Sequence, residues 1–288
     1  MPWHYMQLVL QYISSLKVFV GNRFTRKGRV TLNTNNSRKT ALIVSIIFIA
    51  FAFGFYWLSK DNNVLSTENN SAIHSEALAQ VEKELPIIAT VKKISPETYQ
   101  SFEHLITQYD PTNEDLRRQL FDQVVGNVMK LVLERMEYAS DDSVINFTSR
   151  VNDYLKILLE EDPTGKTCFY SLFPHLRETA EIIPPQKSQA VLLKQIQATN
   201  ELLISSEAGV KQALMSPTEY SEELTQLASG LSAKYGEDTA ILGNLEAGKK
   251  SPALACRISI SFYDEILSIP DNPKKAALLR SLFSSVNN

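Results

Sequence analysis

Residues 40–59 read TALIVSIIFIAFAFGFYWLS, and these twenty consecutive residues contain no charged side chain. At a rise of about 1.5 Å per residue, a helix of this length spans the roughly 30 Å hydrocarbon core of a bilayer. A buried helix of a soluble domain seldom runs so long without a polar face. The segment therefore predicts a single transmembrane helix, with Phe55, Tyr56 and Trp57 as interfacial aromatic anchors at one end.

The two flanks of this segment differ in charge. Residues 1–39 contain seven Lys and Arg residues and no acidic residue, whereas all 32 Asp and Glu residues lie beyond residue 60. Basic flanks remain in the cytoplasm, so we expect 1–39 to be a cytoplasmic segment and the C-terminal part to be exported. The cations nearest the predicted helix form an inner-leaflet basic cluster: Arg23, Arg26, Lys27, Arg29, Arg38 and Lys39.

A cleavable signal peptide is the main alternative to a membrane anchor. Its apolar region would be shorter, closer to the N-terminus and followed closely by a small-x-small cleavage site. The nearest such pattern, Ala77-Leu78-Ala79, comes about twenty residues too late. We therefore expect an uncleaved anchor in a bacterial inner membrane, with the following domain in the periplasm. A mitochondrial presequence is disfavoured, because the arginines lie outside the amphipathic stretch.

That amphipathic stretch lies within residues 1–20. Its apolar residues recur at helical spacing: Tyr5, Val9, Tyr12, Leu16 and Phe19. The helix either lies flat at the inner membrane interface or packs against itself or a partner, and the sequence leaves both open. The basic run that follows suits anionic membrane lipid. Nucleic-acid binding is disfavoured, because the basic run is short, tethered and without a recognisable fold.

Residues 60–85 predict a polar linker, since 61–75 are rich in Asn and Ser and lack periodicity. Residues 86–288 contain repeated helix-start signals, among them Ser95-Pro96-Glu97 and the capping box at 216–219. Ser251-Pro252 and Asn272-Pro273 repeat the pattern of a capping residue followed by proline.

Apolar residues recur at helical spacing between these signals, along 116–136, 144–158, 192–203, 220–231 and 258–269. No strong alternating run or hairpin signal occurs. The predicted fold class is therefore all-α: a transmembrane helix followed by one soluble bundle of about seven or eight helices.

The chain contains two cysteines, Cys168 and Cys256, and both lie in the predicted exported domain. In an oxidising compartment, two cysteines flanked by apolar residues predict one structural disulfide. The bond would close a loop of 88 residues. Two unrelated buried thiols are the alternative, because sequence alone does not show that the Cα atoms come within reach. A redox-active pair is disfavoured by the absence of a C-x-x-C motif.

Other candidate sites have simpler explanations. Gly165-Lys166-Thr167 resembles the end of a phosphate-binding loop, but Glu160 stands where the first glycine is required, so 162–165 are interpreted as a turn. His175 and Glu178 have helical spacing without a third metal ligand. The aromatic residues at 169, 170 and 173 are interpreted as core rather than as a docking surface. We expect no cofactor, no metal and no catalytic set.

Three hypotheses about function follow. The favoured one is a protein-interaction or assembly module of the cell envelope, held by its membrane anchor. The main alternative is a membrane-tethered periplasmic enzyme, a hydrolase or transferase on envelope polymers, without a recognisable motif. A sensor is disfavoured, because 39 cytoplasmic residues are too few for a signalling domain.

Overall fold

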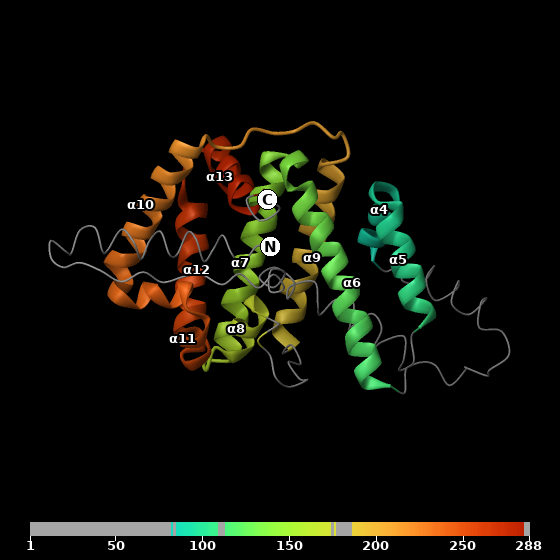
Figure 1. Cartoon of the computed structure of the whole chain (residues 1–288), viewed down its shortest axis with the longest axis horizontal. Helices are drawn as coiled ribbons and strands as arrows, with labels where there is room; N and C mark the ends of the chain where they lie inside the picture. The colour runs from blue at the N-terminus through green and yellow to red at the C-terminus, as the bar shows by residue number, and fades with distance from the viewer. Residues whose placement is uncertain (1–81, 83–84, 109–112, 174–175, 177–185, 285–288) are drawn as a thin grey trace, which may run out of the picture.

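The computed structural model describes residues 82, 85–108, 113–173, 176 and 186–284 (Figure 1). The predicted membrane helix 40–59 and its aromatic anchors lie outside the described residues. So do the amphipathic stretch 1–20, the basic cluster within 23–39 and nearly all of the predicted linker. Within the described ranges, no helix has the length and apolar character needed to cross a bilayer.

The described residues form α-helices and 3-10 helices and contain no strand, which confirms the all-α prediction for this part of the chain. The elements are α4 (Pro86–Ile94), α5 (Pro96–Thr107), α6 (Glu114–Arg135), η1 (Met136–Tyr138), α7 (Asp141–Glu161), α8 (Lys166–Leu172), α9 (Gln186–Ser205), α10 (Pro217–Tyr235), η3 (Gly236–Gly243), α11 (Leu245–Lys250), α12 (Pro252–Ser268) and α13 (Asn272–Ser284).

These ten α-helices exceed the seven or eight that the sequence predicted. The surplus comes from short helices: α4, α8 and α11 have nine, seven and six residues. An apolar face needs about three turns to be recognised by its period, so helices of one or two turns escape that analysis.

Local capping explains where several helices begin. Ser216 forms the predicted capping box with Glu219 at the start of α10, and Ser140 accepts a hydrogen bond from Ser143 N at the start of α7. Ser251 is the N-cap residue of α12 and Pro252 begins that helix, as predicted, although the Ser251 side chain makes no cap hydrogen bond. The predicted cap at Asn272 is wrong, because Asp271 Oδ1 accepts a hydrogen bond from Lys274 N at the start of α13.

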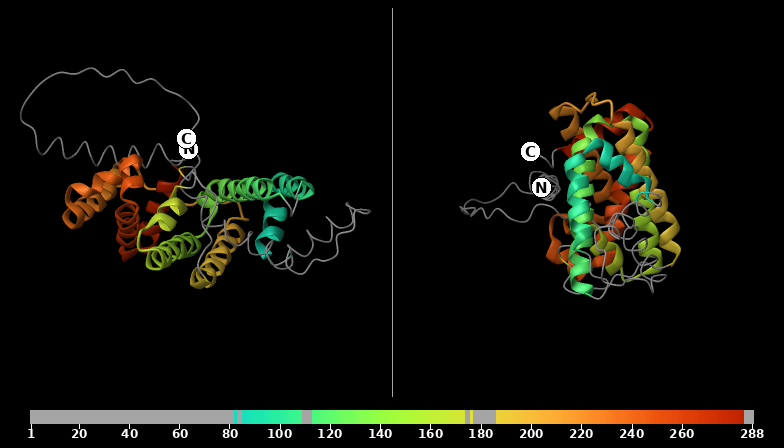
Figure 2. Two further views of the ribbon diagram at one scale, coloured as in Figure 1. Left: turned by 90° about the horizontal axis from the view of Figure 1, so that it is seen from below. Right: turned by 90° about the vertical axis from the view of Figure 1, so that its right-hand side faces the viewer.

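The helices α10, α12, α7, α9 and α6 follow one another across the molecule, with α4 and α5 at the far end (Figures 1 and 2). The central helix α7 contacts α8, α9, α12 and α13. The apolar stripe predicted along 144–158 is completely buried in these contacts. Burying a large apolar side chain contributes about 1.5–3 kcal/mol, so the packing around α7 stabilises the whole domain.

Polar contacts set the alignment of α7 with α9. The Oγ atoms of Ser143 and Ser205 are 2.7 Å apart, and Asn146 Nδ2 donates to Glu201 Oε2 over 3.0 Å. Because residue numbers fall along one helix as they rise along the other, the two helices run antiparallel. Because α9 also packs against α4 and α6, only part of its surface remains exposed.

Candidate functional site

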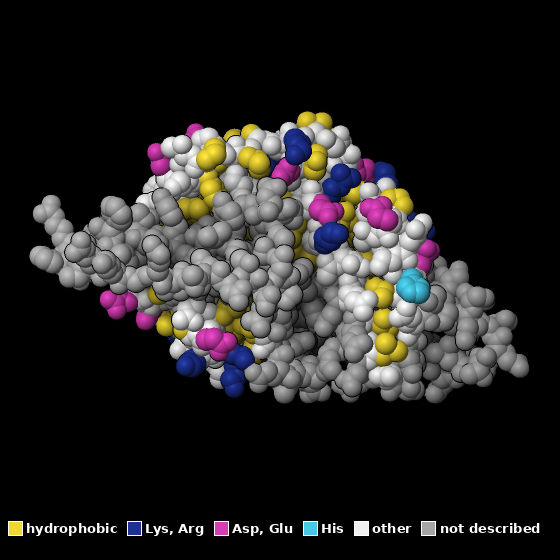
Figure 3. Space-filling view, in the orientation of Figure 1, with side chains coloured by type: hydrophobic (Ala, Val, Ile, Leu, Met, Phe, Trp, Pro, Cys, Tyr) yellow, Lys and Arg dark blue, Asp and Glu magenta, His cyan; other side chains and the backbone are white. Residues whose placement is uncertain are grey.

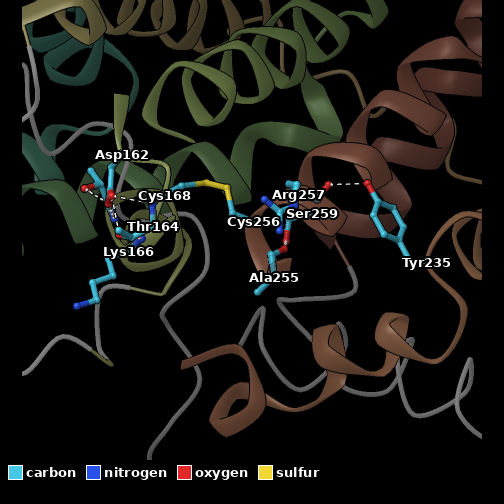
Figure 4. The surroundings of a disulfide bond; sticks show 10 residues. Asp162, Thr164, Lys166, Cys168, Tyr235, Ala255, Cys256, Arg257 and Ser259 are labelled. Carbon is cyan, nitrogen blue, oxygen red and sulfur yellow. Dashed lines mark hydrogen bonds between the residues drawn. A yellow bond between two sulfur atoms is a disulfide. The ribbon is translucent and has the colours of Figure 1, made fainter. Parts of the chain in front are cut away.

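Cys168 of α8 and Cys256 of α12 form a disulfide bond, as the sequence predicted (Figure 4). Their Cα atoms are 6.0 Å apart, within the usual range for a disulfide. Both residues are completely buried. Thiol exchange requires a thiolate to reach a sulfur atom, so burial makes this bond a structural cross-link rather than an exchange centre.

Two glycines allow close approaches around this bond, Gly165 against the start of α12 and Gly248 of α11 against α8. A Cβ atom at Gly165 would lie 2.3 Å from the Ala253 Cα, and one at Gly248 would lie 2.7 Å from Phe169 Cε2. Gly165 also has a positive φ of 71°, which L side chains rarely adopt. The seam between α8 and α12 therefore depends on Gly165 as well as on the disulfide, and the packing of α11 on α8 depends on Gly248.

The turn before α8 is organised by Asp162. Its carboxylate accepts hydrogen bonds from the backbone N–H and the hydroxyl of both Thr164 and Thr167, at 2.6–3.1 Å. Burial alone would raise the pKa of Asp162, but these hydrogen bonds outweigh it and lower the pKa. Lys166 is exposed and points away from the disulfide in Figure 4. These contacts, together with the hydrogen bond from Gly165 N to Asp162 O over 2.8 Å, confirm that 162–165 form a turn.

A polar contact on the other side of α12 connects it to α10. The hydroxyl groups of Tyr235 and Ser261 lie 2.6 Å apart, and Lys234 Nζ donates to Ser261 Oγ over 3.0 Å. Figure 4 shows Tyr235 beside α12, on the side away from Cys168. The helix α12 is therefore held from two directions, by the disulfide and by these hydroxyl contacts.

The aromatic residues beside Cys168 belong to the core. Phe169 and Phe173 are buried with ring centroids 4.8 Å apart, and Tyr170 is half-buried, with its ring in a T-shaped contact with the ring of Phe169. The core interpretation of these residues is confirmed, and they do not form a docking surface.

Among the described residues, the shifted pKa values lie further from neutrality than the ordinary values of the same groups. Wherever the pKa departs from its ordinary value, hydrogen-bonded carboxyl groups such as Glu219 have a lowered pKa, and ion-paired lysines such as Lys274 have a raised one. Burial raises the pKa of Tyr154, and raises that of Tyr263 to about 12.

Metal ligands do not converge in the described ranges, where no group of three His, Cys, Asp or Glu side chains could hold an ion. His104 contacts Gln108 through Nε2 at 2.9 Å on the exposed side of α5. The pair formed by His175 and Glu178 lies outside the described residues.

The large hydrophobic residues that the described part of the chain leaves exposed come from one stretch of its sequence. Leu193 and Ile204 of α9 are 61% and 49% exposed, and Val210 and Leu214 in the following connection are 61% and 44% exposed. Leu193 and Ile204 are eleven residues apart, which places them within about 20° of each other around the helix. All four belong to one stretch, 193–214. We call it the α9–α10 surface.

The second half of this surface is the α9–α10 connection (206–216), which runs above α7 and α13 (Figure 1). Polar contacts hold it on the domain. Gln212 N donates to Glu137 O over 2.8 Å, Lys211 Nζ lies 2.8 Å from Glu137 Oε2, and Met215 N donates to Ser281 Oγ over 2.9 Å. The hydrogen bond from Lys211 lowers the pKa of Glu137. The connection is therefore fixed on its inner side.

Hydrophobic side chains appear along the upper margin of the molecule in Figure 3, where Figure 1 draws this connection. No motif in the sequence marks these residues. One signal was present: the 192–203 stripe accounts for Leu192 and Ile196 as core, whereas Leu193 and Ile204 fall off that stripe. Val210 and Leu214 lie in a segment without periodicity, so only their exposure in the fold marks them.

Of the predicted site residues, the structure brings Cys168 and Cys256 together. The interfacial anchors Phe55, Tyr56 and Trp57 and the basic cluster remain predictions, because they lie outside the described residues. Comparisons of the chain with models of protein families, with curated proteins and with solved structures found no match.

Proposed function

We propose that this protein is a single-pass inner-membrane protein whose exported helical domain acts as a protein-interaction or assembly module of the cell envelope. The charge-free segment 40–59 and the basic residues before it support the anchor, and membrane lipid is its partner there. The N-terminus then lies in the cytoplasm and the helical domain in the periplasm. A buried disulfide suits that compartment, where thiols are oxidised.

The observation that carries the interaction role is the α9–α10 surface. A soluble domain exposes single hydrophobic residues anywhere, but here the large exposed ones of the described chain are confined to one stretch. Leu193 and Ile204 are exposed on α9, so they are available to a partner. Neither is needed to fill the core.

The test uses a photo-crosslinking amino acid at Leu193 in the full chain, in native membranes. We expect a discrete crosslinked product with a second envelope protein, and its loss when Ile204→Asp is added on the same face. The same crosslinker at Gln226, an exposed position on α10, is the matched control. Equal products from both positions, or turnover of an envelope polymer without any crosslinked partner, would favour the membrane-tethered enzyme.

A further inference from the structure

We draw no further inference here: the strongest candidate, the α9–α10 surface with its exposed Leu193, Ile204, Val210 and Leu214, belongs to the site already described, and nothing among the described residues shows what covers it.

Discussion

Arg280 Nη2 donates a hydrogen bond to Asp141 Oδ1 over 2.6 Å, which joins α13 to the first turn of α7. The same nitrogen donates to Ala139 O over 2.7 Å. Arg280 is 1% exposed, although it is charged, and it is among the largest fully buried side chains. This contact closes the central helix against the C-terminal helix, close to Glu137, which holds the α9–α10 connection.

Replacing Arg280 by Met keeps most of its apolar volume and removes the contacts to Asp141 and Ala139. Hydrogen bonds to charged groups contribute about 1.5–3 kcal/mol each, and Asp141 is partly hydrated. We expect the free energy of unfolding to fall by about 2–3 kcal/mol in urea titrations of the full chain in detergent. Lys156→Met, which breaks the exposed ion pair with Asp264, should change it by less than about 1 kcal/mol. Equal losses would contradict a special role for Arg280.

Replacing Cys168 and Cys256 together by Ala removes the cross-link between α8 and α12. The bond closes an 88-residue loop. A disulfide typically raises the free energy of unfolding of the protein by about 2–4 kcal/mol. We expect a lower urea midpoint with an unchanged helical circular dichroism spectrum. Because both sulfur atoms are buried, a mild reductant should leave the wild-type midpoint unchanged until the protein unfolds. Rapid reduction of the folded protein would show that the bond is accessible.

Two glycine variants distinguish the effect of the close contact at Gly165 from the effect of backbone strain. Gly165 and Gly209 both have positive φ, at 71° and 65°, but only Gly165 has a neighbour where a Cβ would lie. Gly209→Ala should lower the free energy of unfolding by about 1 kcal/mol, from strain alone. Gly165→Ala adds a clash with the backbone of Ala253 and should lower the free energy of unfolding by more than about 3 kcal/mol. Similar values for both variants, measured by thermal or urea unfolding, would refute the close approach.

Asp162 makes stability depend on acidic pH. Its folded-state pKa is lowered, so the carboxylate contributes stability that is fully present above its unfolded pKa. That contribution is lost as the pH falls through the lower, folded-state value. Asp162→Asn should therefore be less stable than wild type at pH 6, and the difference should shrink steadily below about pH 4. A difference that stays constant between pH 6 and pH 2, in unfolding titrations, would exclude this carboxylate as its source.

Several helices of the fold were predicted from the local sequence pattern. The stripe along 144–158 is buried throughout, and the capping box at Ser216 begins α10 as predicted. These features depend on residues three or four apart, which any helix brings together. The short helices and the cap of α13 were missed, because one or two turns carry too little periodicity and because Asp271 competes with Asn272 for the same role.

The α9–α10 surface could not be predicted from the local sequence pattern. Whether Leu193 is core or surface depends on which face of α9 meets α7, and contacts such as Asn146 with Glu201 decide this across 55 positions of sequence. Val210 and Leu214 follow no helical period. Their exposure results from the anchoring of Gln212 and Met215 on η1 and α13.

The sequence by itself determined the helical class, the charge-free segment at 40–59, the opposite charges of its two flanks and the expectation of one disulfide. Each is a property of composition or of residues close together in the chain. Only the tertiary structure decided that Cys168 and Cys256 are within bonding distance, that Arg280 is buried, and that exposed hydrophobic residues gather on α9 and its connection. Those outcomes depend on packing between helices distant in sequence, which no local pattern encodes.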